Sequence, residues 1–168
     1  MKTLILSCNT GEGHNSCAKA IKEYYDTVGD ECVIKDGLEF ISPKVSNFIS
    51  WGHTFIYRHL PLLFKYGYVY IEKHPTMFKE GSFVYRFITR GTERMYTCIC
   101  DEQYDIIICT HVFTSLMLTD MLKKHPMNQP TALVSTDYTC SPSTKDSNLD
   151  YYFIPDDEFA TDFECRTI

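Results

Sequence analysis

Five short runs of mostly apolar residues, separated by turns and by helical patterns, constrain the fold of this chain more than any other feature. They are residues 3–7 (TLILS), 31–35 (ECVIK), 105–109 (DIIIC), 131–135 (TALVS) and 151–154 (YYFI). Unbroken runs such as DIIIC are typical of parallel strands that are buried on both faces. Apolar residues at helical spacing follow over 16–28 and 116–124. Four or five strands that alternate with helices predict an α/β fold with a doubly wound parallel sheet.

Length and composition are those of one globular domain, which we expect to span residues 1–168. No run approaches the roughly 18 apolar residues that a membrane span needs. Residues 1–8 hold only a short apolar stretch before the polar residues 9–15, so a secretory signal does not fit and we expect a cytoplasmic protein. The eight cysteines are scattered without a C-x-x-C pair, which favours buried thiols over disulfides.

The charge distribution is asymmetric. A net charge of −6 argues against nucleic-acid partners. Residues 44–96, however, hold eight basic and three acidic side chains, or +5, which leaves −11 for the rest, and they hold thirteen of the chain's twenty-four aromatic residues. Phe48, Trp51 and Phe55 recur at helical spacing near Arg58, which predicts a helical segment that contacts an anionic membrane surface. Core packing or an oligomer contact is the alternative for these aromatics.

A glycine-containing loop, SCNTGEGHNS at 7–16, follows the first predicted strand and leads into a helix. Ligands of open α/β sheets bind at the carboxyl ends of the strands, and glycines at 11 and 13 allow close approach of the backbone. His14 is able to accept a proton near neutral pH. The loop lacks both the G-x-G-x-x-G and the G-K-[ST] phosphate-binding patterns. The alternative is a tight turn in which Asn15 or Ser16 caps the helix.

Two further strands deliver polar residues to the same sheet edge. Thr110 and His111 follow DIIIC, and Thr136 and Asp137 follow TALVS. Each pair alone fits a helix cap or a loop hydrogen bond, but together with His14 they predict one shared crevice. The histidines and cysteines lack zinc-ligand spacing, so we expect no metal. The cysteines at strand ends, Cys8 and Cys109, are expected to be inert thiols.

Three motifs carry a resemblance to a known family: SCNTGEGHNSCAKAI at 7–21, YDIIICTHVF at 104–113, and PTALVSTDYT at 130–139 followed by LDYYFIP at 149–155. In this order they resemble the N-terminal domain of the monogalactosyldiacylglycerol synthase and processive diacylglycerol glucosyltransferase family, from residue 2 to about 159. The resemblance implies a Rossmann-like half of a two-domain GT-B architecture. Such enzymes transfer a hexose from a UDP-sugar to diacylglycerol with inversion and without a catalytic metal.

The resemblance also implies roles for single residues. His14 matches the general base, and acceptor contacts are implied for the surrounding positions, which are Gly11, Gly13, Asn15, Thr110, His111, Thr136 and Asp137. The segment EFATDFECRTI at 158–168 departs from the helix that the family has at this point.

The family's C-terminal UDP-sugar domain is not in this sequence. We therefore expect an acceptor-binding half that binds no cofactor itself, depends on a separate donor-binding domain or polypeptide, and is inactive alone. The location implied is peripheral, on the inner face of the plasma membrane. A non-catalytic lipid-binding module of the same fold is the alternative.

Overall fold

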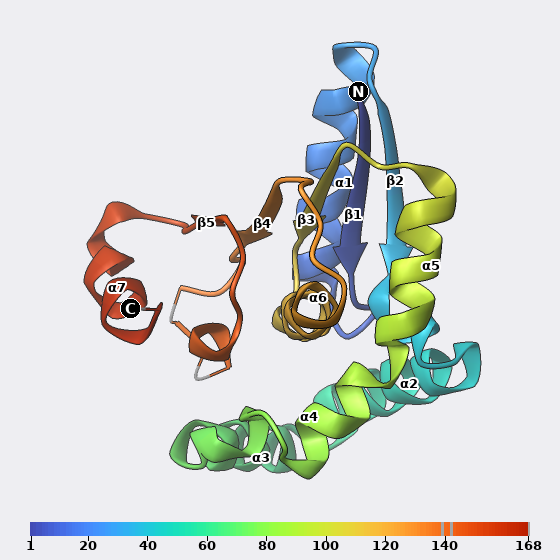
Figure 1. The fold of residues 1–168 in the computed structure, drawn as a ribbon. Coiled ribbons are helices and arrows are strands. Elements are labelled where there is room, and N and C mark those ends of the chain that lie inside the picture. Colours follow the sequence, from blue (N-terminus) through green and yellow to red (C-terminus); the bar gives the residue numbers. More distant parts are fainter. Residues whose placement is uncertain (139, 142, 168) are drawn as a thin grey trace.

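The computed structural model describes residues 1–138, 140–141 and 143–167 and shows an α/β fold. Five parallel strands form one sheet in the order β2-β1-β3-β4-β5 (Figure 1). They are β1 (Lys2–Ser7), β2 (Glu31–Asp36), β3 (Ile106–Cys109), β4 (Thr131–Val134) and β5 (Tyr151–Phe153). The predicted Rossmann-like α/β class is confirmed, and all five predicted strands form. Thr139, the last residue of one predicted motif, lies outside the described residues.

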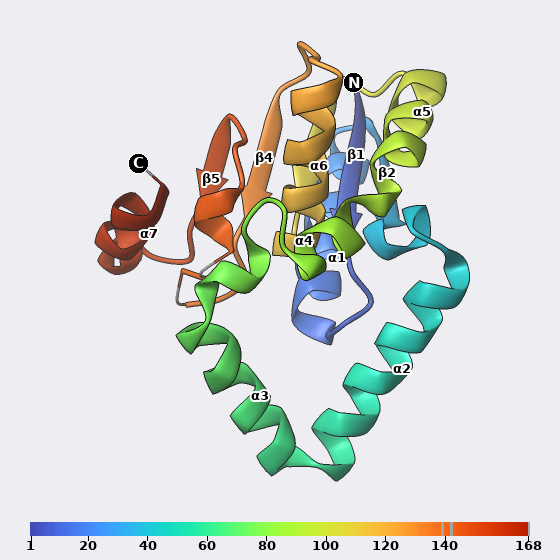
Figure 2. The same ribbon diagram turned by 60° about the horizontal axis from the view of Figure 1, so that its bottom comes forward.

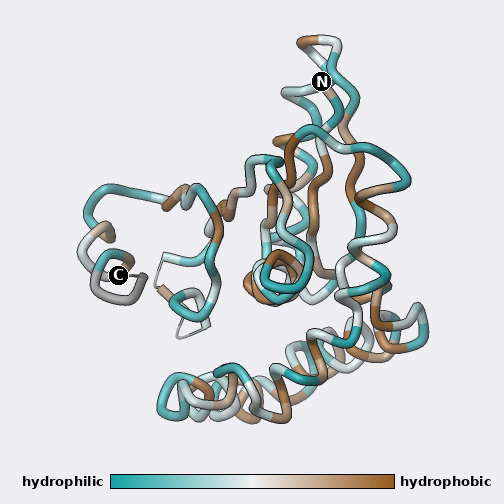
Figure 3. Tube along the Cα trace, in the orientation of Figure 1, coloured by the Kyte–Doolittle hydropathy of each residue, from teal (hydrophilic) through white to brown (hydrophobic). Residues whose placement is uncertain are grey.

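Helices cover both faces of the sheet. Successive residues of a strand point to opposite sides, so each face carries apolar side chains that a helix can bury. Leu4 and Leu6 pack with Ile107 in the larger core, beneath α5 (Thr92–Glu102) and α6 (Val112–Lys124). Ile5 and Ile108 pack on the other face, beneath α1 (Glu12–Thr27). Figure 2 shows α6 and α1 on opposite sides, and Figure 3 shows the hydrophobic strands between them.

The first helix begins four residues earlier than the pattern predicts. Its N-cap is Gly11, and no side chain among the described residues caps it. Asn15 and Ser16 therefore lie inside α1 rather than at its cap, so that alternative is wrong. Gly13 lies in the first turn of α1. The early start places His14 in the first turn, at the carboxyl edge of the sheet.

A long insertion separates β2 from α5. It consists of η1 (Gly37–Phe40), α2 (Pro43–His59), α3 (Pro61–Lys73), η2 (Pro75–Phe78), α4 (Phe83–Ile88) and η3 (Thr89–Gly91). Ser42 caps α2, and Ser46 donates a hydrogen bond to Asp36 at the end of β2, which anchors the helix to the sheet. Figure 2 shows α2 and α3 as a V that projects from the carboxyl edge of the strands.

Three aromatic side chains on α2 point to solvent. Phe48, Trp51 and Phe55 are 71%, 62% and 42% exposed, so these rings do not pack in the core. Trp51 stacks on Phe55 with ring centroids 5.3 Å apart. Elsewhere in the segment, Tyr85 is buried and does belong to the core. Over the described residues, no helix has both the length and the hydropathy that crossing a bilayer takes.

The remaining elements follow β4. They are η4 (Thr144–Asp146), η5 (Asp157–Phe159) and α7 (Ala160–Thr167). A short helix is therefore present where the sequence departs from the family's helical pattern, and it lies against η4. Figure 1 shows α7 beyond β5, at the far side of the sheet from β2.

Candidate functional site

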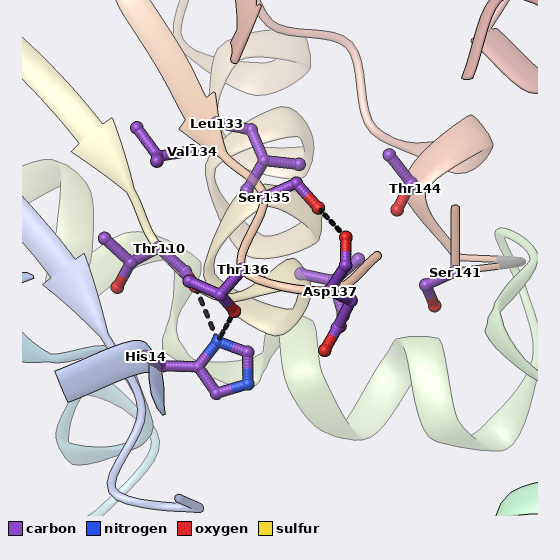
Figure 4. A pocket seen from close by; sticks show the side chains of 10 residues that line it. His14, Thr110, Leu133, Val134, Ser135, Thr136, Asp137, Ser141 and Thr144 are labelled. Carbon is purple, nitrogen blue, oxygen red and sulfur yellow. Dashed lines mark hydrogen bonds between the residues drawn. The ribbon is translucent and has the colours of Figure 1, made fainter. Parts of the chain in front are cut away.

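The candidate site lies where the strand order reverses. From β1 the chain passes to β2 on one side of it and then to β3 on its other side. The connections that leave the parallel neighbours β1 and β3 therefore run toward opposite ends of the sheet. In open α/β sheets such a switch point leaves a crevice outside the strand ends. His14 comes from the helix after β1, Thr110 and His111 follow β3, and Thr136 and Asp137 follow β4. His14, Thr110, Thr136 and Asp137 line one crevice, whereas His111 does not line it (Figure 4).

His14 is held through one ring nitrogen. Its Nδ1 lies 2.8 Å from the carbonyl oxygen of Thr110 and 2.7 Å from Oγ1 of Thr136. A carbonyl oxygen only accepts, so Nδ1 must carry the proton of the neutral ring. The other nitrogen, Nε2, then keeps its lone pair. In Figure 4 this nitrogen lies on the far side of the ring from Thr110 and Thr136.

His111 is engaged at both ring nitrogens. Its Nδ1 accepts from the backbone N–H of Phe113, 3.0 Å away, and so caps α6. Its Nε2 lies 3.1 Å from Oγ1 of Thr10. The ring is 8% exposed and meets the His14 ring edge to face, with centroids 4.4 Å apart. Burial lowers the pKa of His111 well below its usual value, and the charges of His14 and His53 lower it further.

His53 is a third histidine near the site, and it was not predicted from the sequence. It lies on the half-buried side of α2, where its ring packs against Phe64 with centroids 5.3 Å apart. Burial lowers the pKa of His53, and His14 adds to the effect. Helical periodicity places His53 on the face of α2 opposite Trp51. It does not place His53 near His14, which lies 39 residues earlier in the sequence. Only the tertiary structure brings it there.

The side-chain amide of Asn15 holds the glycine loop in place through two hydrogen bonds. Asn15 accepts from Ser7 through Oδ1 (2.9 Å) and donates to Asn9 through Nδ2 (3.0 Å), which ties the loop to the end of β1. Gly11 has an extended backbone (φ 172°) that any residue adopts. No heavy atom of the described residues lies within 4 Å of a Cβ built on Gly11 or Gly13. A tight turn therefore does not explain these glycines, and the space above them is open.

The crevice is small and lined by hydroxyl groups. Its cavity volume is about 20 Å³, and about 270 Å³ when the adjoining space open to solvent is counted. Three of the hydroxyl residues that line it, Ser135, Ser141 and Thr144, were not predicted from the sequence. The density of Ser and Thr over 135–144 was the available signal. Such a lining suits a polar group that carries hydroxyls rather than an acyl chain.

The strand ends give little support for a cysteine nucleophile or a metal site. Cys8 and Cys109 are buried, as predicted, and burial raises the pKa of Cys109 to about 12. Such thiols stay protonated and are poor nucleophiles. Within the described part of the chain, no cluster of three or more His, Cys, Asp or Glu side chains is arranged to hold a metal ion.

Comparison with known proteins gives one family. The model of the family described as monogalactosyldiacylglycerol (MGDG) synthase matches residues 14–168. The matched region begins at His14 and includes the strand ends that carry His111 and Asp137. No curated protein and no solved structure gives a match.

Proposed function

The chain belongs to the monogalactosyldiacylglycerol synthase family, and from this premise we propose that it is the acceptor-lipid-binding half of an inverting glycosyltransferase. The reaction proposed is transfer of a hexose from a UDP-sugar to the free hydroxyl of diacylglycerol. The observation that carries the proposal is the orientation of His14, whose Nδ1 is bound to the sheet edge and whose Nε2 points away from that edge, where no hydrogen bond among the described residues engages it.

His14 has the geometry of a general base. A lipid hydroxyl is a weak nucleophile, and removing its proton as the new bond forms lowers the barrier. In the proposed step, Nε2 takes the hydroxyl proton while the hydroxyl oxygen attacks the anomeric carbon. The bond from that carbon to the diphosphate breaks, and UDP leaves with the electron pair. Attack opposite the leaving group inverts the anomeric centre, and a protonated His14 remains to return its proton to solvent.

The polar lining of the crevice supports binding of the glycerol end of the lipid. Thr136 and Asp137 flank His14, and the open space above Gly11 and Gly13 lets an acceptor approach the backbone. We assign the acceptor contacts to these four residues and to the backbone of Thr110. Asn15 has both amide atoms bound within the loop, so its proposed part is to hold the loop in place.

The surface of α2 and α3 supports a peripheral membrane location. Phe48, Trp51 and Phe55 are exposed on one face, and Arg58 is exposed near the end of α2. Rings at headgroup depth and a cation near anionic lipids favour binding to a bilayer surface. The V of α2 and α3 projects from the same sheet edge as His14 (Figure 2). The proposed location is therefore the cytoplasmic face of the plasma membrane, with the crevice turned toward the lipid.

The donor is assigned to another domain. None of the residues that line the described crevice is Lys or Arg, and Asp137 adds a negative charge there. A diphosphate leaving group needs preorganised cations or N–H donors. We therefore propose that the UDP-sugar is held by a separate donor-binding domain or polypeptide, and that residues 1–168 alone do not complete the reaction.

A lipid-binding module without catalysis is the second candidate, because the exposed aromatic face of α2 serves membrane binding in either case. The two differ at His14. The proposed enzyme half presents Nε2 to a lipid hydroxyl, whereas a binding module has no need for that contact.

A titration followed by NMR separates them. The imidazole signals of His14 are recorded in detergent micelles with 1,2-dioctanoylglycerol and, as a matched control, with trioctanoylglycerol, which lacks the free hydroxyl. We expect the diacyl lipid alone to shift the Nε2 resonance. Equal spectra with both lipids would show that the hydroxyl does not meet His14, and the catalytic assignment would fail.

A further inference from the structure

A buried hydrogen bond joins the glycine loop to the turn after β3. Thr10 is 9% exposed and His111 is 8% exposed, and Oγ1 of the first lies 3.1 Å from Nε2 of the second. The two residues are 101 positions apart in the sequence. This bond therefore ties the loop that precedes His14 to the strand end whose carbonyl group His14 contacts.

The hydrogen bonds of His111 are consistent with a single tautomer of its neutral ring. Nδ1 accepts from the N–H of Phe113, so in the neutral ring the proton lies on Nε2. Nε2 then donates to Oγ1 of Thr10. Each nitrogen thus has a separate task, one as the cap of α6 and one as the donor that holds Thr10. Because both nitrogens are occupied inside the protein, neither remains for a ligand.

His111 is also adjacent to the group that sets the protonation of His14. Thr110, its neighbour in the chain, accepts from Nδ1 of His14 across 2.8 Å, and the ring of His111 lies edge to face with that of His14. We propose that His111 is a positioning residue, which holds the Thr110 carbonyl and the glycine loop so that Nδ1 of His14 keeps its proton and Nε2 keeps its lone pair. It acts through His14 and Thr10 and not by contact with the acceptor.

Burial supports this role, because a charged ring at this position would repel a protonated His14. The titratable groups that affect His111 electrostatically are His14 and His53, and both lower its pKa. The surroundings of His111 therefore favour its neutral ring. The effect of His111 on catalysis rests on the proposed function, whereas its effect on the tautomer of His14 does not.

Two substitutions separate the tasks of the two nitrogens. H111N keeps an acceptor near the place of Nδ1, and Asn is a favourable helix cap, but it loses the donor to Thr10. H111Q places an amide near Nε2 but loses the cap. T10V removes the other partner of the buried bond at nearly constant volume, and T10S restores the hydroxyl. The control is H125Q, which removes an imidazole at the end of α6, stacked on Tyr96 and away from the crevice.

The test is the tautomer of His14, read from its two imidazole ¹⁵N chemical shifts in the full chain without lipid or sugar. We expect the Nδ1–H form in the wild type, in T10S and in H125Q. In H111N and T10V we expect both nitrogens to move toward a common averaged shift, as the second tautomer becomes populated. H111Q, which keeps the bond to Thr10, is expected to lie closer to the wild type than H111N.

Two results would overturn the proposal. If H111N and T10V are folded, as judged by amide shift dispersion, and the His14 shifts are unchanged, His111 is only a helix cap. If both variants are unfolded, the bond acts on folding and not on His14. The readout contains no substrate, so a failed dioctanoylglycerol titration with an intact tautomer effect would reject the proposed function alone.

Discussion

Nδ1 of His14 and the carbonyl oxygen of Thr110 lie 2.8 Å apart, although 96 residues separate them in the chain. A backbone carbonyl is an acceptor that no side-chain substitution removes, so the register of β3 beside β1 determines which nitrogen of His14 carries the proton. The hydroxyl of Thr136 adds a second contact at the same nitrogen. Two strand ends thus orient the proposed base.

The first prediction concerns the base itself. H14N places an amide N–H near the position of Nδ1 and can keep the bond to Thr110, but it cannot accept a proton. In an enzyme reconstituted with a donor-binding domain of the family, we expect kcat to fall about 100- to 10,000-fold with little change in KM for the lipid. Initial rates at varied diacylglycerol check this. An unchanged kcat would reduce His14 to a structural residue.

The second prediction concerns Thr136. T136V removes the hydroxyl while it keeps the size of the side chain, whereas T136S keeps the hydroxyl. A single hydrogen bond contributes about 0.5–1.5 kcal/mol, which corresponds to a roughly 2- to 13-fold change in an equilibrium or a rate. We therefore expect kcat of T136V to fall within that range and T136S to stay near the wild type. A loss as large as that of H14N would give Thr136 a direct part in the chemistry.

Much of the sheet could be predicted from the sequence because its strands are local patterns. Unbroken runs such as DIIIC report burial on both faces, and the turn residues between runs mark their ends. The convergence of His14 with Thr136 followed from topology alone, since parallel strands end at one edge. The start of α1 did not, because Gly11 and Gly13 suppress the local helical signal at the N-cap and in the first turn.

The direction of the aromatic side chains and the role of His111 required tertiary information. Phe48 and Tyr85 belong to the same aromatic segment, yet one is 71% exposed and the other 4%. Composition cannot distinguish them, because exposure depends on which face of each helix meets the sheet. His111 likewise satisfies a sequence pattern for a polar strand end, but its buried partner Thr10 lies 101 residues away.

The third prediction is a pH effect on stability. The pKa of His111 is lowered in the folded state, so below its unfolded pKa of about 6.5 the unfolded chain binds a proton that the folded chain does not. The stabilising contribution of the neutral ring is thus present above pH 6.5 and is lost as the pH falls from there toward the folded pKa. The slope approaches about 1.4 kcal/mol per pH unit for one proton.

Urea unfolding of the wild type and of H111Q at pH 7.5 and pH 5.5 measures this contribution. H111Q is expected to be less stable at pH 7.5, where the bonds of the neutral ring are intact in the wild type. The difference should shrink at pH 5.5. A difference that is constant with pH would show that His111 does not remain neutral in the folded state.

The fourth prediction concerns the exposed face of α2. Trp51 is the single tryptophan, so its fluorescence reports this face directly. With vesicles that contain anionic lipid we expect a blue shift and salt-sensitive binding, because Arg58 favours anionic headgroups and the rings enter the interface. The paired change F48S/F55S should weaken binding at least tenfold, or about 1.4 kcal/mol. Tyr24→Ser, which removes a ring that is 66% exposed on α1, is the matched control.

Binding to neutral and anionic vesicles and sedimentation without lipid decide between the alternatives for this face. Equal binding to neutral and anionic vesicles would remove the electrostatic part of the proposal. If F48S/F55S instead changes the sedimentation coefficient without lipid, the face is an oligomer contact.

The last prediction is that residues 1–168 bind UDP and UDP-sugars only weakly. Two helix N-termini near the described crevice favour an anion, that of α1, where Glu12 in the first turn opposes the effect, and that of α6, which begins at Val112. A helix N-terminus contributes about 0.3–1 kcal/mol, whereas a micromolar Kd requires about 8 kcal/mol. The crevice lining lacks Lys and Arg and contains Asp137. Calorimetry with UDP should therefore show millimolar binding or none. Micromolar binding would place the donor site on this domain and would require the roles of His14 and its neighbours to be reassigned.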